Sequence, residues 1–447
     1  MSNKNNLENI VKDYPENDVD LDGDDDFSEN KTHQTLGQEF DLFFISDQAV
    51  GSPFILPNGK IIIQKLQDYF RNYYQLNNYQ EVETPNLFNN SCFEKSGHAD
   101  KYHENIFHIN RIQHHTDDIE QLDLKPMNCP GDCLVFDHIK PSYSQLPIRI
   151  ADFGILHRNE SRGALRGLTR VRRFQQDDAH IFCRFDQVEH ELESLINLMK
   201  TFYSYWGFSY KLELSTRPSE YIGDLDKWNT AEDILKKKLV EQFGALEDNK
   251  WELNIGDGAF YGPKIDFKIK DTQDRWHQCG TIQLDFNLPE RFNLEYQGPN
   301  SKERPVLIHR AIMGSLERFL AIILEDTQGN LPYWFSPRQL YIVPVHQKLI
   351  DESPAYFEEL KEVIYPTRIA WKGSLSYRVN YKLDDSELTM KKKIKLAYAK
   401  KYNYLLVIGR KEIEDKFVTL QQSTSKTETL KLSFSQLRDF LENERIY

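Results

Sequence analysis

The chain of 447 residues lacks the features that mark membrane proteins and disulfide-rich secreted proteins. No apolar run approaches the roughly 20 residues that a membrane span requires. Its five cysteines are odd in number and follow no regular framework, which indicates a reducing compartment. An Arg-rich, acid-poor presequence of the mitochondrial kind is also missing. We therefore expect a cytoplasmic protein that binds no membrane, although a mitochondrial location stays open.

The chain also lacks an excess of positive charge, because 69 acidic residues outnumber 56 lysines and arginines and give a formal net charge of −13. This balance argues against a protein that coats nucleic acid through its overall field. It is compatible with a local basic groove, since much of the acid lies in the N-terminal stretch DVDLDGDDDFSEN. Residues 1–35 contain few apolar side chains, so we expect a disordered acidic tail. The remaining length is sufficient for two or three domains with their own cores.

Residues 157–183, HRNESRGALRGLTRVRRFQQDDAHIFC, combine clustered charge with two glycines and an alternating pattern. Arg158 and Glu160 are two residues apart, so on an entering strand both side chains point to one face. Gly163 and Gly167 suit a turn, and the residues after them alternate as in an exit strand. So much charge beside an apolar sheet indicates a site for a triphosphate and a polar small molecule.

The flanking patterns predict the remaining organisation. Apolar residues at helical spacing between Ile62 and Tyr73 predict a long helix, followed by a strand that ends at Pro85. A helix is expected over 187–205, and two strands around a glycine-rich turn over 251–271. PVLIHRAIMGSLERFLAIILED reads as a strand, a turn at Gly314 and an amphipathic helix. From residue 336 onward, strand and helix signals alternate as in an α/β unit.

The run TRVRRFQQDDAHIFC resembles motif 2 of class II aminoacyl-tRNA synthetases, and in particular of the threonyl-tRNA synthetase family. GDGAFYGPKID and the motif 3-like PVLIHRAIMGSLERFLAIILED extend the resemblance, which runs from about residue 51 to the C-terminus. It implies an α+β fold: a catalytic domain with an antiparallel sheet flanked by helices over 36–335, then a smaller α/β anticodon-binding domain over 336–447. The helix and strand before Pro85 resemble motif 1, which implies a homodimer.

The resemblance implies an ATP site and a transfer step. Arg158 would clamp the α-phosphate and Arg318 the far end of ATP, with Mg²⁺ bridging phosphate oxygens. His98, in the loop EKSGHADKY, would assist proton removal during transfer of threonine to tRNA, a task suited to a pKa near neutrality. The other residues implied for ATP are Glu160, Val171, Phe174, Gln278, Thr281 and Ser315.

The resemblance also implies a zinc site made by Cys129, His180 and His309, with Cys129 in a turn stiffened by proline and glycine. One thiolate and two imidazoles leave a fourth position open, where threonine would bind and isosteric valine would not. Asp178 would accept a hydrogen bond from the threonine hydroxyl. Alone, Cys129 and Cys133 are a weak zinc signal, and Cys133 is expected to be structural. The remaining residues implied for the threonine pocket are Met127, Gln176, Tyr261 and Gln283.

The lysine run at 391–395 falls where the family reads the anticodon of tRNA(Thr), so the resemblance implies Lys393 and Lys395 as anticodon residues. Such a run is otherwise a solvated surface. Lys395 stands where the family carries an arginine, and lysine cannot make a bidentate contact to guanine.

Three further departures leave the function open. No editing domain precedes Gly51, so we expect no clearance of mischarged seryl-tRNA in cis. Asp132 replaces a histidine of the family pattern three residues from Cys129, and Arg162 and Arg166 add charge to the motif 2 loop. The favoured hypothesis is that the chain is an active threonyl-tRNA synthetase that uses zinc, ATP and Mg²⁺. The alternatives are a specialised copy with another tRNA or adenylation substrate, and an inactive tRNA-binding or regulatory homologue.

Overall fold

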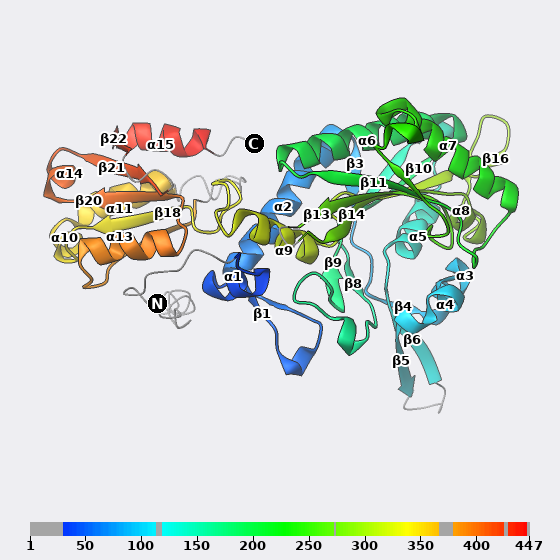
Figure 1. Ribbon diagram of the computed structural model, residues 1–447, viewed down its shortest axis with the longest axis horizontal. Coiled ribbons are helices and arrows are strands. Elements are labelled where there is room, and N and C mark those ends of the chain that lie inside the picture. Colours follow the sequence, from blue (N-terminus) through cyan, green and yellow to red (C-terminus); the bar gives the residue numbers. More distant parts are fainter. Residues whose placement is uncertain (1–29, 113–118, 272–273, 366–378, 424–427, 445–447) are drawn as a thin grey trace, which may run out of the picture.

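The computed structural model describes residues 30–112, 119–271, 274–365, 379–423 and 428–444. Most of the predicted acidic tail, residues 1–29, lies outside this part of the chain. Figure 1 shows a larger body of mixed helices and strands and a smaller body that begins near strand β18. The α+β fold class predicted from the sequence is confirmed.

One eight-stranded sheet forms the centre of the larger body. Neighbouring strands run antiparallel except for β11–β12 and β3–β7, which are parallel. The order across the sheet is β12 (Glu252–Asn254), β11 (Tyr210–Ser215), β13 (Lys264–Lys270), β14 (Trp276–Asp285), β17 (Val306–Ala311), β10 (Asp178–Cys183), β7 (Ile148–Asp152) and β3 (Tyr79–Glu81).

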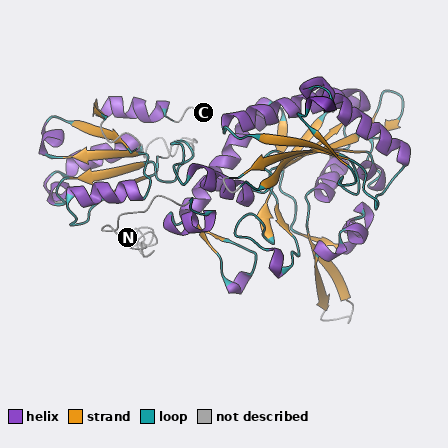
Figure 2. Cartoon of the chain, viewed as in Figure 1, coloured by secondary structure: helices purple, strands orange, loops and turns teal. Residues whose placement is uncertain are grey.

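The two faces of this sheet differ in chemistry because successive side chains on a strand point to opposite sides. Ile181, Ile282 and Ile308 belong to the main hydrophobic core. The helices α2 (Pro57–Leu76), α6 (Val188–Tyr205), α7 (Leu225–Phe243) and α9 (Leu316–Thr327) contribute to the same core, and α6 and α7 lie along the upper side of the sheet in Figure 2. Phe182 and Leu307 belong to a second core together with α5 (Cys129–Ile139) and α8 (Asn287–Arg291).

Strand register gathers polar side chains on this second face. His180 of β10 lies opposite His309 of β17, and His309 lies opposite Gln283 of β14. Gln283 in turn lies opposite Lys264 of β13. Residues directly opposite one another in an antiparallel pair share a face, so four strands present a continuous polar row there.

Smaller elements surround the open side of this face. A three-stranded sheet has the order β4 (Leu87–Asn89), β6 (Ile119–Leu124) and β5 (Phe107–Ile112). Strands β8 (Ile155–His157) and β9 (Arg173–Gln175) pair with each other, as do β1 (Phe43–Phe44) and β2 (Phe54–Ile55), and β15 (Tyr296–Gln297) and β16 (Lys302–Glu303). The short helices of this region are α1 (His33–Glu39), α3 (Asn90–Ser96) and α4 (His98–Lys101).

The smaller body is built on a mixed five-stranded sheet. Its order is β19 (Tyr381–Leu383), β18 (Leu340–Pro344), β20 (Tyr404–Ile408), β21 (Phe417–Gln422) and β22 (Thr429–Ser433). One core holds residues of α11 (Pro354–Ile364) and α15 (Phe434–Asn443), and a separate core holds Tyr341, Val343 and Leu405 with α13 (Met390–Ala399). Two short helices, α10 (Lys348–Glu352) and α14 (Arg410–Glu414), complete it.

Three local predictions were wrong. The tail was expected to reach residue 35, but α1 begins at His33, and His33 is buried. Arg158 and Glu160 lie beyond the end of β8 at His157, so they do not share a strand. Cys129 begins helix α5 instead of lying in a turn, because Pro130 suits the first helical turn. Within the described residues, none of the helices combines the length and apolarity needed to cross a membrane.

Candidate active site

A single cavity collects the residues that the sequence pointed to, although they come from segments nearly 200 residues apart. Strands β10, β14 and β17 form its floor, and the starts of α5 and α9 together with residues 158–176 form its sides. The predicted residues that line it are Met127, Cys129, Arg158, Glu160, Val171, Phe174, Gln176, Asp178, His180, Tyr261, Gln278, Thr281, Gln283, His309, Ser315 and Arg318.

Cys129, His180 and His309 meet at one end of the cavity. All three are buried, and their ligand atoms lie within 4.8 Å of one another. The two imidazoles come from the directly opposed positions of β10 and β17, and the thiol reaches them from the first residue of α5. A thiol with two imidazoles is the donor set of zinc sites that keep one position open.

Each imidazole is held by a buried carboxylate. His180 Nδ1 lies 2.5 Å from Asp132 Oδ2, and His309 Nε2 lies 2.9 Å from Asp285 Oδ2. These contacts fix the rings and leave His180 Nε2 and His309 Nδ1 as the nitrogens open to a metal. The departure from the family pattern at Asp132 thus falls directly behind a predicted ligand.

The electrostatics of this end favour a bound cation. Burial, followed by Asp178 and Asp285, raises the pKa of the Cys129 thiol well above its ordinary value. Burial likewise raises the pKa of Asp132, and Asp132 Oδ1 is buried without a hydrogen-bond partner among the described residues. A divalent cation beside these groups offsets the cost of burying their charge. The residues therefore fit a metal ion.

Asp178 borders the metal trio on the side of the open cavity. Burial raises its pKa to about 6, and Asn128 Nδ2 donates a hydrogen bond of 2.8 Å to its Oδ2. Tyr261 Oη donates to Gln283 Oε1 at 2.8 Å across the same region. These groups surround a small polar volume next to the metal donors.

The two predicted arginines lie at the other end of the cavity. The Arg158 guanidinium carbon stands 4.9 Å from the centre of the Phe174 ring, and its Nε donates to the carbonyl of Pro126. Arg318 lies in the first turn of α9, which is capped by the Ser315 hydroxyl. Its guanidinium donates to two backbone carbonyls, those of Thr169 at 3.0 Å and Gln278 at 2.8 Å. Arg318 is therefore held inside the cavity and does not project into solvent from the helix.

Lys264 and Asp266 are among the ionisable residues of the cavity region that were missed. Asp266 accepts hydrogen bonds from Gln278 Nε2 at 2.6 Å and Thr281 Oγ1 at 3.1 Å, and Lys264 Nζ lies 2.5 Å from it. Gln278 and Thr281, which were expected to contact ligand, thus also orient around a buried carboxylate. Lys264 and Asp266 are two residues apart in GPKIDF, and this strand-like spacing could have indicated that both side chains share one face of the sheet.

The paired aspartates of QQDDAH have separate roles. Asp177 is fully buried and accepts hydrogen bonds from the backbone amides of Ile312, Met313 and Gly314 at 2.9, 3.1 and 2.9 Å. It therefore fixes the turn before α9, while Asp178 faces the cavity. Glu317, also missed, accepts from the Gln175 amide at 3.0 Å and ties β9 to the same helix.

The expectation for His98 was wrong in two respects. Its side chain is completely buried at the start of α4, with Nδ1 2.8 Å from Ser96 Oγ and Nε2 3.2 Å from Met127 Sδ. Burial lowers its pKa to about 3 instead of leaving it near neutrality. His98 packs behind Met127 and is not among the residues that line the cavity.

The two lysines predicted to contact the anticodon lie in different environments. Lys393 is completely buried, and its Nζ donates to the carbonyl of Asp384 at 2.9 Å. Its expected contact with an anticodon is therefore wrong, because the helical period turns this residue toward the sheet. Lys395 lies on the exposed side of α13.

Known proteins match both bodies. The tRNA synthetase class II core domain (G, H, P, S and T) matches residues 111–327, and an anticodon binding domain matches residues 339–444. The cytoplasmic threonine–tRNA ligase 1 of Rattus norvegicus is 46% identical over 401 residues, which cover 89% of this chain and 54% of that protein. The cytoplasmic threonine–tRNA ligase of Saccharomyces cerevisiae is 43% identical over 426 residues, or 93% of this chain and 55% of that protein.

This chain therefore spans about half the length of the curated relatives that it matches. Among solved structures, the RNA binding domain of threonyl-tRNA synthetase from Cryptosporidium parvum Iowa II aligns with a TM-score of 0.83 at 43% identity. That alignment covers 93% of this chain and 98% of the other. With that coverage and the matching class II core, the chain belongs to the threonyl-tRNA synthetase family of class II aminoacyl-tRNA synthetases.

Proposed function

We propose that this protein activates threonine with ATP and transfers it to the 3′ end of tRNA(Thr). The observation that carries the proposal is the joint position of the Cys129, His180 and His309 trio and Asp178 in one cavity with two arginines. Metal donors next to a buried carboxylate suit a hydroxyl-bearing amino acid, and the arginines suit a polyphosphate.

The amino-acid end would select threonine by a hydrogen bond that valine cannot make. We propose that Cys129, His180 and His309 hold zinc, which when bound supplies a Lewis-acidic position for the amino and hydroxyl groups of the substrate. Asp178 would accept a hydrogen bond from the threonine hydroxyl, and Asn128 Nδ2 orients that carboxylate by donating to it at 2.8 Å. Valine would leave Asp178 buried without this donor, which costs far more than a missing methyl group in an apolar pocket. Met127, Gln176, Tyr261 and Gln283 would complete the pocket.

The nucleotide end of the cavity would bind ATP between the guanidinium groups of Arg158 and Arg318. Arg158 would contact the α-phosphate and Arg318 the γ-phosphate or the adenine ring, and Mg²⁺ bound to ATP supplies further neutralisation of phosphate charge. Both guanidiniums are already oriented, Arg158 over Phe174 and Arg318 between two carbonyls. Glu160 and the backbone at Val171 would select adenine, and Phe174 would stack on it. Gln278, Thr281 and Ser315 would contribute the remaining polar contacts.

The chemistry then requires little beyond positioning. A threonine carboxylate oxygen attacks the α-phosphorus of ATP, the bond to the β-phosphate oxygen breaks, and pyrophosphate leaves. A hydroxyl of the terminal ribose of tRNA next attacks the adenylate carbonyl, and AMP leaves as the new ester forms. Because His98 is buried and neutral, we propose that it shapes the pocket behind Met127 and does not remove a proton in this step.

The smaller body would bind the anticodon of tRNA(Thr), with Lys395 as its candidate contact. The motif 1-like segment, which comprises α2 and β3, supports a homodimer. The cytoplasmic relatives support a cytoplasmic location.

ATP–pyrophosphate exchange on purified protein of known zinc content tests the proposal. Threonine is expected to support exchange, serine to support it less well, and valine to give almost none. Asp178→Asn is expected to lower the threonine rate and the threonine-to-valine ratio, while Asp186→Asn, at an exposed carboxylate, leaves both unchanged. Absence of exchange by zinc-loaded protein would overturn the proposal and favour a tRNA-binding homologue without catalysis.

A further inference from the structure

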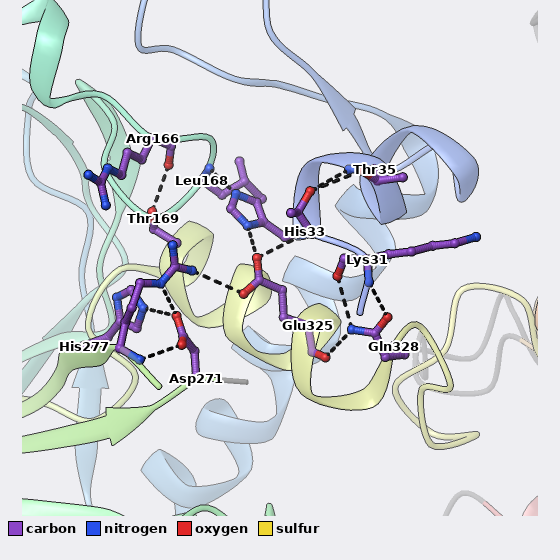
Figure 3. Close-up of polar contacts among 12 residues, drawn as sticks. Lys31, His33, Thr35, Arg166, Leu168, Thr169, Asp271, His277, Glu325 and Gln328 are labelled. Carbon is purple, nitrogen blue, oxygen red and sulfur yellow. Dashed lines mark hydrogen bonds and ion pairs between the residues drawn. The ribbon is translucent and has the colours of Figure 1, made fainter. Parts of the chain in front are cut away.

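His33 of helix α1 makes a side-chain hydrogen bond with the loop that borders the nucleotide end of the cavity. Figure 3 shows His33 between Leu168 and Glu325, which belong to the motif 2 loop and to α9. The Leu168 amide donates to His33 Nε2 at 3.1 Å. On the other side of the ring, Nδ1 and the His33 amide lie 2.6 and 3.0 Å from Glu325 Oε1.

The two contacts fix the direction of the hydrogen bonds. Nε2 accepts from an amide, so Nδ1 carries the ring proton and donates it to Glu325. His33 and Glu325 are 6% and 2% exposed, which keeps water from replacing either bond. The loop backbone at Gly167 comes so close to His33 that a Cβ at this position would stand 2.1 Å from His33 Nε2. The φ of Gly167 is +46°.

The loop in turn positions Arg318. Residues 166–170 close on themselves through Arg166 and Arg170, whose backbones pair. The carbonyl of Thr169, the residue after Leu168, accepts the hydrogen bond from Arg318 Nε at 3.0 Å. Two hydrogen bonds, joined by the covalent link between Leu168 and Thr169, therefore connect His33 to the Arg318 guanidinium.

We propose that His33 is a positioning residue for ATP binding: its Nε2 fixes the Leu168 amide, and thereby holds the Thr169 carbonyl against Arg318. The proposal rests on the function proposed above, in which Arg318 contacts ATP. Among the described residues, none of the hydrogen bonds of this path involves the side chains proposed to bind threonine, which are those of Met127, Gln176, Asp178, Tyr261 and Gln283. The effect is therefore specific to the nucleotide.

Two isosteric variants separate this role from simple anchoring of α1. His33→Gln places an acceptor near the Nε2 position, whereas His33→Asn places a donor near the Nδ1 position. Positioning predicts that His33→Asn and His33→Ala raise KM for ATP about 5- to 10-fold, the value of one hydrogen bond, with KM for threonine unchanged. It also predicts that His33→Gln restores most of the ATP affinity. Rescue by Asn and not by Gln would overturn the proposal in favour of anchoring through Glu325.

Gln328→Gly provides the matched control. It removes three hydrogen bonds of the Gln328 side chain, two to the Lys31 backbone and one to the Glu325 carbonyl, and glycine accepts the φ of +47° at that position. It loosens the same segment without touching the loop, so KM for ATP is expected to stay at the wild-type value.

Amide hydrogen exchange of the 166–170 segment gives a readout that does not depend on catalysis. Faster exchange of this segment in His33→Asn than in His33→Gln supports the positioning role even if the wild-type protein fails to activate threonine. Equal protection in wild type, Asn and Ala variants would overturn it.

Discussion

Replacement of Asp132 is expected to weaken metal binding without unfolding the protein. Asp132 Oδ2 lies 2.5 Å from His180 Nδ1, and the carboxylate is completely buried. Loss of such a carboxylate partner typically lowers metal affinity 10- to 100-fold, about 1.4–2.7 kcal/mol. Asp132→Asn keeps an acceptor for the Nδ1 proton but removes the charge, so we expect a loss of about 10-fold. Asp132→Leu removes both and is expected to lose about 100-fold.

Zinc affinity is measured by competition with a chromophoric chelator, and folding by circular dichroism. Asp123→Asn is the matched control, because Asp123 is also buried and lies 2.6 Å from a histidine nitrogen, that of His108, in the sheet of β4, β5 and β6. Its zinc affinity is expected to equal that of the wild type. Wild-type zinc affinity in both Asp132 variants would refute the carboxylate support of His180.

Three further substitutions test other parts of the account. Arg318→Lys is expected to raise KM for ATP about 10-fold or more, because one ammonium cannot bond two carbonyls and still present a planar cation; unchanged ATP kinetics would contradict this. Gly314→Ala is expected to cost about 1–3 kcal/mol of unfolding free energy in thermal melts, since φ is +71° and a Cβ would stand 2.6 Å from the Cys279 carbonyl oxygen. Gly163→Ala, where a Cβ meets nothing within 4 Å, is its control, and equal losses would refute the explanation. Lys393→Met is expected to destabilise the protein by about 3 kcal/mol, because the buried Asp384 carboxylate loses its cation and keeps only the hydrogen bonds from Tyr341 and Ser386. Lys395→Met is expected to leave the melting temperature unchanged and to weaken tRNA binding; the reverse pattern would show that Lys393 is the contact.

Strand periodicity explains why so much of the cavity was predictable. Asp178 and His180, or Thr281 and Gln283, are two residues apart on strands, so a linear pattern already places each pair on one face. The sheet pairing then brings His180 opposite His309 across more than 120 residues of chain. The resemblance supplied that pairing, because a single strand does not specify its neighbour.

Burial at element ends was the main source of error. His98 was expected in an accessible loop and Lys393 at an anticodon-binding surface, but tertiary packing encloses both side chains. Contacts between residues far apart in the chain could not be predicted from the sequence either. Asp177 with the amides after residue 311, and His33 with Glu325, depend on where separate elements meet and leave no local periodicity.

The most direct test of the central claim compares threonine- and valine-dependent ATP–pyrophosphate exchange before zinc removal, after it, and after zinc is restored. We expect about one zinc per chain, fast exchange with threonine, loss of that exchange in the zinc-free protein, and recovery on restoration, with valine near background throughout. Threonine exchange that persists without zinc, or valine exchange at a similar rate, would contradict threonine selection at Cys129, His180 and His309.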